Sequence, residues 1–236
     1  MYDEVMRERK AHTMVAILRD FLGPVVKQLS VLDIGASTGI IDSCLASEVG
    51  SVVGMDIDES AVAYACKKYW RENLFFCVGD ALDVPFGDDT FDIVICSQIY
   101  EHVADAWKMM DEVWRVLVPG GVCYFAAGNK IMWKEPHYQL PLLSLLPRPL
   151  GHMYLQLMGK GSRYHELHYT FWGLRKLAHK FSLHDYTAKV VRDPSKFGAT
   201  YMIRPGSFKA SLSRIISKYL IWLAPGYIWI LEKPDE

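Results

Sequence analysis

The sequence predicts an α/β fold with a doubly wound parallel sheet. Over the first half of the 236 residues, short apolar runs alternate with segments of helical periodicity. The runs are almost continuously apolar, which is typical of strands covered by helices on both faces. The first run leads directly into a turn with two glycines and then a helix. In such folds ligands bind at the carboxyl ends of the strands, so we expect the functional site there.

The elements of the first half follow from this alternation. A first helix is predicted over 5–22, because apolar side chains recur on one helical face until Gly23-Pro24 interrupts the pattern. Strands are predicted, in chain order, at residues 30–34, 52–56, 74–79, 91–96 and 122–126. Helices are predicted between them at about 39–49, 60–69 and 103–118. In the last helix, Trp107 and Trp114 belong to the apolar stripe, so we expect both to pack against the sheet.

The alternation fails in the second half. Residues 129–163 are rich in proline, leucine and aromatic side chains without a clear period, which predicts an inserted cap over the site. Thr170 is a suitable N-cap for a following helix. The remaining predicted elements are a helix at 170–181, a strand at 183–191, an irregular basic stretch at 192–219 and a last strand at 227–232.

Charge and cysteine content narrow the class of protein. Residues 1–127 carry 10 Lys/Arg and 20 Asp/Glu, a net charge of −10, whereas residues 128–236 carry 16 and 7, a net charge of +9, so the halves are expected to face different partners. Five cysteines without a C-x-x-C pair are typical of reduced thiols, and we expect them to be buried. The mixed charge of the first residues argues against a signal peptide, and the most apolar stretch, residues 219–231, is too short to span a bilayer. These features predict a cytoplasmic protein, with attachment to a membrane surface left open.

The turn after the first strand indicates a nucleotide cofactor. Asp33 ends the buried strand, and Gly35 and Gly39 let the following backbone pass close beneath a ligand. A dinucleotide-binding G-x-G-x-x-G turn needs a further glycine near Ala36-Ser37, so a nicotinamide oxidoreductase is disfavoured. Asp56 ends the second strand 21 positions after Gly35, where it can accept hydrogen bonds from both hydroxyls of a ribose. The sequence therefore predicts an adenosine cofactor.

Four ordered segments of the chain resemble one enzyme family. They read VLDIGASTG, VVGMDID, GDALDVPFGDDTFDIVICSQIYEHV and RVLVPGG, and the resemblance covers roughly residues 28–127. The chain resembles the class I S-adenosylmethionine-dependent methyltransferases, most closely the ubiquinone/menaquinone-biosynthesis-like group called methyltransferase type 11. The resemblance implies a Rossmann-like sheet of seven strands, mostly parallel, with an antiparallel last strand supplied by GYIWILEK. It also implies S-adenosyl-L-methionine as the cofactor.

The resemblance further implies which residues bind this cofactor. Asp80 and the Ala81 N–H, after the third strand, are expected at the adenine, on which Ile57 packs. Ser97 ends the fourth strand, near the methionine portion. The full expected set is Asp33, Gly35, Ala36, Gly39, Asp56, Ile57, Asp80, Ala81 and Ser97. We expect one methyltransferase domain over 1–236, with a cofactor-binding half at 1–127, an inserted cap or substrate region at 128–168 and a C-terminal part at 169–236 that completes the sheet.

The implied reaction is an in-line displacement at a sulfonium methyl group. It requires alignment of the acceptor and exclusion of water, but no protein nucleophile. The acceptor atom can be oxygen, nitrogen or carbon. If it is a hydroxyl oxygen, a base must take its proton, and the ordinary pKa of histidine suits that role. His102, just after the fourth strand, is the candidate base, and the alternative is that it caps the helix from Val103.

No metal is predicted. Some members of the family that act on quinone precursors carry E-x-x-E-H after the fourth strand and bind a divalent metal, but here the amide of Gln98 replaces the first carboxylate before Glu101. His165 and His168 have the spacing of a metal pair, but no third ligand is evident. By the resemblance, this segment faces the acceptor instead. The candidate substrate contacts are Tyr164, His165, His168 and Tyr169, with plain packing as the alternative.

The basic second half indicates the acceptor. Residues 130–218 contain 15 Lys/Arg and 4 Asp/Glu, interleaved with aromatic side chains and with a leucine-rich run at 140–146. Positive charge beside apolar side chains is typical of a surface that meets anionic lipid. We expect a small or amphipathic acceptor, such as a lipid or lipid-linked glycan, and peripheral contact with an anionic membrane, rather than a nucleic-acid partner. The alternatives are a quinone-precursor or RNA methyltransferase, an NAD-dependent oxidoreductase, a cofactor-binding protein without catalysis, and a cap whose charges and leucines serve only solvation and packing.

Overall fold

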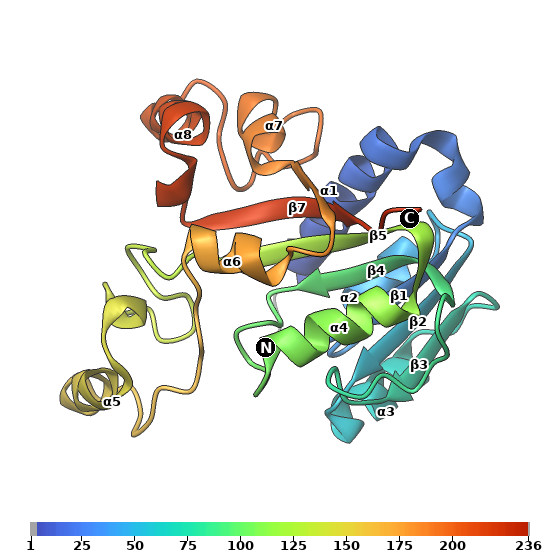
Figure 1. Ribbon diagram of the computed structural model, residues 1–236, viewed down its shortest axis with the longest axis horizontal. Coiled ribbons are helices and arrows are strands. Elements are labelled where there is room, and N and C mark those ends of the chain that lie inside the picture. Colours follow the sequence, from blue (N-terminus) through green and yellow to red (C-terminus); the bar gives the residue numbers. More distant parts are fainter. Residues whose placement is uncertain (1–3, 236) are drawn as a thin grey trace.

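Seven strands form one sheet in the order β3-β2-β1-β4-β5-β7-β6. The computed structural model of the chain describes residues 4–235 (Figure 1). Strands β1 to β5 are parallel, and β7 runs antiparallel to both β5 and β6. The strands are β1 Ser30–Ile34, β2 Ser51–Asp56, β3 Leu74–Val78, β4 Phe91–Ser97, β5 Leu117–Gly128, β6 Ser182–Asp185 and β7 Gly226–Glu232. The predicted α/β fold class and its antiparallel last strand are confirmed.

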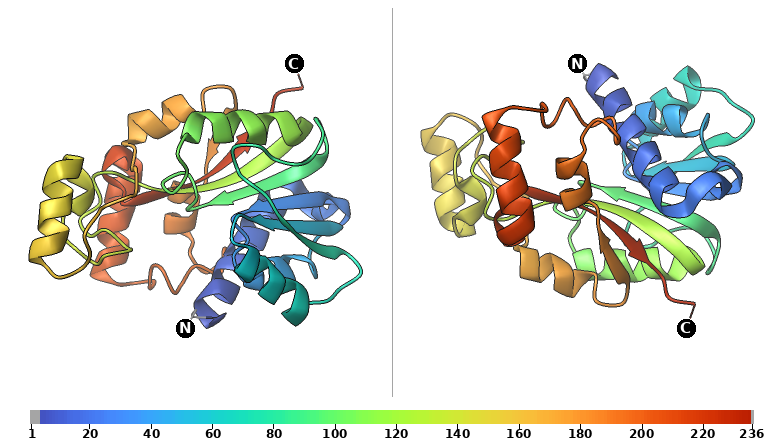
Figure 2. Two further views of the ribbon diagram at one scale, coloured as in Figure 1. Left: turned by 90° about the horizontal axis from the view of Figure 1, so that it is seen from below. Right: turned by 90° about the horizontal axis from the view of Figure 1, so that it is seen from above.

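Helices cover both faces of the sheet (Figure 2). Side chains alternate along β5, so Phe125 packs with α4 and α6 on one face, whereas Tyr124 packs with α1, α2 and α7 on the other. The helices are α1 Glu4–Leu22, α2 Ile40–Leu45, α3 Glu59–Lys68, α4 Ala106–Val116, α5 Arg148–Leu157, α6 Phe171–Leu177, α7 Thr187–Arg192 and α8 Phe208–Tyr219, with 3-10 turns η1 Gly23–Gln28, η2 Leu143–Leu145 and η3 Ile221–Leu223. The first five predicted strands and the first four predicted helices are confirmed, with shifted ends.

The prediction of one strand over 183–191 was wrong. Strand β6 ends at Asp185, whose side chain accepts a hydrogen bond from the backbone N–H of Thr187 at 2.7 Å. This contact turns the chain into α7, which brings Val190 and Val191 into the core from a helix. A run of apolar residues this short fits either a strand or a buried helix, so periodicity alone misled the prediction.

Two helices in segments predicted to be irregular were missed. Helix α5 lies in the cap, and α8 begins after Ser207, whose side chain accepts a hydrogen bond from the backbone N–H of Ala210. Both helices leave most of their large apolar side chains exposed. An apolar stripe is a sign of a helix that packs on a core, and here the stripes point outward.

The prediction that Trp107 lies in the core was also wrong. Asp105 is the N-cap of α4, so the helix starts at Ala106 rather than at 103, and its buried stripe runs through Met109, Met110, Val113 and Val116. Trp107 lies on the flank of that stripe and is partly exposed. Of the five cysteines, all of which are free thiols, Cys96 and Cys123 are buried as expected, whereas Cys66 is exposed.

Asn129 fixes the point at which the cap leaves the sheet. Its fully buried side-chain amide donates hydrogen bonds to the backbone oxygens of Trp222 and Ala224 and to the hydroxyl of Tyr227, at 2.7 to 2.9 Å. The start of the cap and the start of β7 are therefore joined, although they lie more than 90 residues apart in the chain. Within the described residues, no helix combines the length and the hydrophobicity that a membrane span requires.

Candidate active site

The glycine turn follows β1 and is held against β2. The backbone N–H groups of Gly35 and Ala36 both donate to the oxygen of Met55, at 2.8 and 3.0 Å. A Cβ on Gly35 would lie 2.1 Å from Cδ1 of Ile99, and a Cβ on Gly39 would lie 2.6 Å from Cζ of Phe76. Both glycines also have positive φ, at 86° and 74°. The left-handed backbone, together with the close packing, therefore already accounts for both glycines, in addition to the close approach of a ligand that we predicted.

Asp56 is a rigid carboxylate at the end of β2. Its Oδ2 accepts a hydrogen bond from the Ser37 N–H at 2.7 Å, and its Oδ1 accepts one from the Asp58 N–H at 2.9 Å. Each oxygen keeps a lone pair for a further donor. Ile57 beside it is 70% exposed. A fixed acceptor next to an exposed apolar side chain fits the ribose and adenine of S-adenosyl-L-methionine, so these residues are compatible with the cofactor.

The other predicted cofactor residues lie along the same edge of the sheet. The register pairs Asp56 at the end of β2 with Val78 at the end of β3, and Asp80 follows two residues later. Asp80 accepts a hydrogen bond from the Leu82 N–H at 2.9 Å, and Ser97 ends β4. The carboxyl ends of β1 to β4 therefore bring together the residues that the motifs single out. Their role in binding the cofactor stays a prediction.

Asp33 is buried, and the structure adds a neighbour that the sequence did not reveal. Asp42 of α2 is also buried, and burial raises the pKa of both carboxyl groups, with mutual repulsion contributing to the rise at Asp33. Two adjacent buried carboxyls favour a shared proton over two negative charges. Asp42 was missed because nothing in the sequence distinguishes it from an exposed acid in the first turn of a helix.

A cavity of about 570 Å³ opens beside the end of β4. Ser97 and Gln98 line it where it meets the predicted cofactor edge, and α1, α7 and α8 supply its walls. Gln98 has a positive φ of 60°, an unusual backbone conformation for a residue other than glycine and one that is common at functional sites. The principal apolar lining residues are Met14, Tyr124, Val190, Tyr201, Ile216 and Ile228. The cavity therefore suits an apolar or amphipathic molecule.

The His137 ring lies between His102 and this cavity. The imidazole of His102 packs edge-on against that of His137, with 4.8 Å between the ring centroids, and His137 is the one of the two that lines the cavity. Burial of part of the ring and the nearby His137 lower the pKa of His102, which favours the neutral form that can accept a proton. The alternative that His102 caps the following helix was wrong, because Asp105 is the N-cap of α4. The role of His102 as a base stays a prediction.

The four predicted substrate contacts do not line the cavity. Tyr164 is buried in a small cluster with Leu140, Leu143 and Leu155, so packing accounts for it. Tyr169 stacks on Tyr100, and its backbone N–H donates to the Tyr100 hydroxyl at 3.3 Å. The two histidines of this set differ in burial: His165 is exposed, whereas His168 is buried. As contacts of an acceptor, the four residues stay a prediction.

Glu135 and His137 were not predicted as site residues. They belong to the cap, and His137 reaches the cavity beside Pro136. The one available signal was the pairing of a glutamate and a histidine two residues apart in a segment already assigned to the site. Only the fold shows that they meet His168, which lies more than 30 residues further along the chain.

Comparison with known proteins agrees with this geometry. The sequence model of a family described as a methyltransferase domain matches residues 32–125, from β1 into β5. This segment is a methyltransferase domain. Such domains use S-adenosyl-L-methionine, which fits the carboxylate and the exposed apolar side chain at the end of β2. The NAD-dependent oxidoreductase alternative is not supported by any of these matches.

Two curated proteins are each 32% identical to this chain over the part that includes the methyltransferase domain. Over 121 residues the chain is 32% identical to a Mycolicibacterium smegmatis protein named "probable S-adenosylmethionine-dependent methyltransferase", and the alignment covers 51% of this chain and 46% of that protein. Over 139 residues it is 32% identical to the demethylmenaquinone methyltransferase of Clavibacter sepedonicus, which aligns 53% of this chain with 57% of that protein. The chain thus spans about half the length of the curated relatives it matches.

The whole chain also resembles solved methyltransferase structures in its fold. The S-adenosylmethionine-dependent methyltransferase from Mesorhizobium loti superposes with a TM-score of 0.59 at 17% identity, and the superposition covers 92% of this chain and 95% of that one. At this identity the likeness concerns the fold. The seven-stranded sheet is therefore consistent with the predicted fold class.

Proposed function

We propose that this protein transfers the methyl group of S-adenosyl-L-methionine to an amphipathic, lipid-like acceptor taken from an anionic membrane surface. The observation that carries the proposal is that two faces of α8 meet two different environments. One face of this helix walls the apolar cavity beside Ser97, and another face presents a row of exposed apolar side chains to the outside.

The exposed face of α8 has the spacing of an interfacial helix. Phe208, Leu212, Ile215 and Tyr219 follow one another at intervals of four, three and four residues, and all four are exposed, Phe208 by 84%. On another face Ser213, Ile216 and Ser217 line the cavity. An apolar molecule that leaves a membrane beneath the first face would therefore reach the cavity by passing α8.

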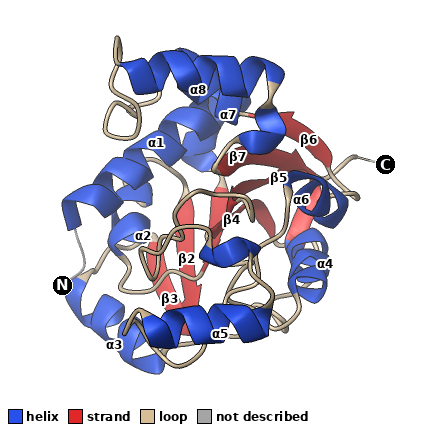
Figure 3. Ribbon diagram, turned by 90° about the vertical axis from the view of Figure 1, so that its left-hand side faces the viewer, coloured by secondary structure: helices blue, strands red, loops and turns tan. Residues whose placement is uncertain are grey.

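Charge and further apolar groups accompany this face. Arg214 and Lys218 are exposed on α8 itself, and the surrounding half of the chain carries an excess of Lys and Arg. Helix α5 lies at the same end of the molecule and also exposes apolar side chains (Figures 1 and 3). Near η3, the partly exposed rings of Trp172 and Trp222 stack with 5.8 Å between their centroids. Basic, apolar and tryptophan side chains at one end are typical of a surface that rests on anionic lipid.

The chain's own residues would align the reaction rather than take part covalently. When bound, the cofactor supplies a methyl group on a positively charged sulfur. Asp56 and Ile57 would hold its nucleoside, and Ser97 lies where the cofactor edge and the cavity meet. The apolar walls would orient the acceptor and exclude water. For a hydroxyl acceptor, a neutral His102 is the predicted proton acceptor.

A quinone precursor is the second candidate acceptor. The relative from Clavibacter sepedonicus is named as a demethylmenaquinone methyltransferase. A quinone precursor with an apolar tail is itself amphipathic, so the same cavity and the same membrane face would suit it. An RNA acceptor is less well supported, since the cavity is lined mainly by apolar side chains.

Labelled methyl transfer would test the proposal. The protein is incubated with methyl-labelled S-adenosyl-L-methionine and, in separate reactions, with total membrane lipid or total RNA. We expect label in the organic phase of the lipid reaction, and mass analysis of the product separates quinone precursors from other lipids. Label only in RNA would overturn the lipid acceptor, and no label in any reaction with bound cofactor would favour a non-catalytic role.

A further inference from the structure

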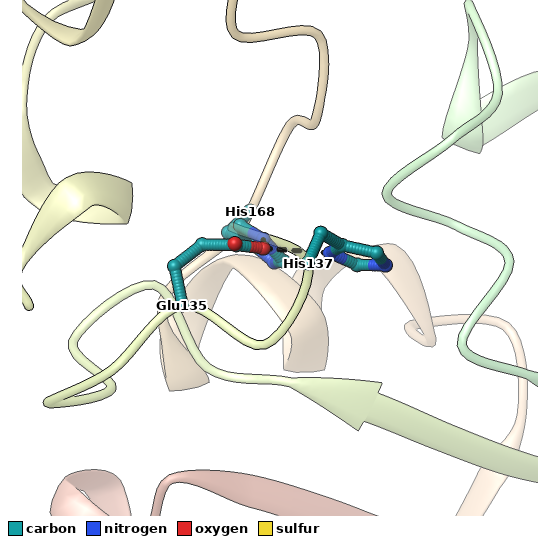
Figure 4. Close-up of side chains that lie close together, drawn as sticks. All are labelled: Glu135, His137 and His168. Carbon is teal, nitrogen blue, oxygen red and sulfur yellow. Dashed lines mark hydrogen bonds and ion pairs between the residues drawn. The ribbon is translucent and has the colours of Figure 1, made fainter. Parts of the chain in front are cut away.

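Three side chains of suitable chemistry converge beside the cavity. Glu135, His137 and His168 each offer one ligand atom, and these atoms lie within 4.8 Å of one another (Figure 4). Nδ1 of His137 is 2.6 Å from Oε1 of Glu135, and Nε2 of His168 is 3.7 Å from the same oxygen. Glu135 and His168 are buried, whereas His137 is open to the cavity.

Backbone contacts hold the three residues in place. The loop after Glu135 is closed by hydrogen bonds from the Glu135 N–H to the Leu140 oxygen and from the Gln139 N–H to the Glu135 oxygen, both 2.9 Å. The Leu167 N–H donates to the oxygen of Glu101 at 2.9 Å, which docks the segment that carries His168 next to the end of β4. Two separate parts of the chain thus present their ligands to one point.

Polar atoms at this point lack partners. Nε2 of His168 is buried and has no hydrogen bond. Glu101, whose backbone oxygen accepts the hydrogen bond from Leu167 next to His168, is 1% exposed and has no hydrogen bond to either side-chain oxygen. A buried polar atom without a partner costs free energy, so native proteins satisfy nearly all of them. The bond between Glu135 and His137 therefore leaves Nε2 of His168, at 3.7 Å from Glu135, and the side-chain oxygens of Glu101 without a hydrogen bond.

We propose that Glu135, His137 and His168 bind a divalent transition-metal ion, with Zn²⁺ as the best match. Two imidazoles and one carboxylate form a donor set that Zn²⁺ accepts while keeping a fourth position open. The ion would bind Nε2 of His168, which has no hydrogen bond. Its two positive charges would balance the buried carboxylates of Glu135 and Glu101, which no Lys or Arg contacts through an ion pair within residues 4–235. Because His137 lines the cavity, the open position would be accessible from the acceptor side.

Metal binding can be tested without a methyl donor or acceptor, so the result is independent of the proposed function. Purified full-length protein is stripped with a chelator and titrated by calorimetry with Zn²⁺ and, separately, with Mg²⁺. We expect one Zn²⁺ per chain and no comparable binding of Mg²⁺, because imidazole ligands favour transition metals. Titration with Co²⁺ should produce the visible absorption of a four-coordinate site.

Matched variants locate the ion. His168→Ala and Glu135→Gln should each weaken Zn²⁺ binding by about 100-fold or more, since even loss of outer-shell partners often costs 10- to 100-fold. His165→Ala removes an exposed histidine three residues from His168 and should leave the affinity unchanged. Circular dichroism of the stripped variants confirms that they are folded. Absence of Co²⁺ absorption in the parent protein, equal binding of Mg²⁺, or equal losses in the His165 variant would overturn the proposal.

Discussion

The carboxyl groups of Asp33 and Asp42 are buried together on either side of the glycine turn. Burial raises the pKa of both, and the repulsion between them adds to the rise at Asp33. In the unfolded chain both groups have the ordinary carboxyl pKa near 4. The folded protein therefore binds more protons than the unfolded chain from about pH 4 up to the raised pKa values. Across that range the free energy of unfolding falls as the pH rises.

Asp42→Asn should accordingly stabilise the protein at high pH. The amide has a similar shape but cannot ionise, so the cost of a second buried charge disappears. At pH 8 we expect a gain of about 1 kcal/mol or more, or roughly 2–4 °C in Tm, and a smaller difference at pH 5. Thermal denaturation at both pH values measures this. Asp83→Asn, at an exposed position, is the control, and an equal gain in both variants would contradict the explanation.

Asp56→Ala should weaken cofactor binding. The substitution removes the acceptor proposed for the ribose hydroxyls and the two backbone bonds that hold Ser37 and Asp58. Loss of a hydrogen bond to a charged group predicts a decrease in affinity for S-adenosylhomocysteine of about 10- to 100-fold, measured by calorimetry. Asp58→Ala is the matched control. It removes the N-cap of α3, costing about 1 kcal/mol of stability, but should leave the affinity unchanged.

Ser213→Trp should fill the cavity from the α8 side. We expect kcat/KM for the acceptor to fall by about 10- to 100-fold, because a large side chain displaces the acceptor or strains the wall. The affinity for S-adenosylhomocysteine should remain within about twofold of the parent value, since Ser97 is the one predicted cofactor residue among those that line the cavity. Ser211→Trp places the same ring on the exposed surface of α8. If both variants lose activity equally, the cavity is not the acceptor site.

Removing apolar side chains from the outer face of α8 should release the protein from membranes. The double variant Phe208→Ser and Ile215→Ser is expected to bind vesicles of anionic phospholipid at least tenfold more weakly in co-sedimentation at low salt. Trp70→Ser removes a side chain that is 82% exposed in the acidic half of the chain, and should have no effect. Equal binding of the parent to neutral and anionic vesicles would contradict the charge contribution.

The sequence predicted well those elements in which the pattern of apolar residues reflects burial in the core. Strands β1, β2 and β4 are apolar on both faces because helices cover both, so their residues stand out without any knowledge of neighbours. Helices α5 and α8 have stripes as regular as a core helix, but these point away from the sheet. The turn at Asp185 that ends β6 depends on one side-chain hydrogen bond, which periodicity does not detect.

The residues of the candidate site also differ in how far the sequence predicts them. Asp56 and the glycine turn belong to local motifs, so their spacing along the chain predicted their place in the fold. Glu135 and His168 are brought together only by the folding of the cap against the end of β4, and neither carries a motif. Gln98 was noticed for the carboxylate it replaces, whereas its positive φ and its place on the cavity emerged from the structure.

The two faces of α8 also constrain how this chain can vary. One face touches the cavity and another carries Phe208 and its exposed companions, and the two are separated by about the 100° that one residue contributes to a helix. Inserting one residue near Ser207 would turn Phe208 and its companions toward the cavity, whereas deleting one would turn Ser213 toward the outer face. In the function proposed above, the register of this one helix would couple substrate choice to membrane attachment, so substitutions here should be tolerated far better than changes in length.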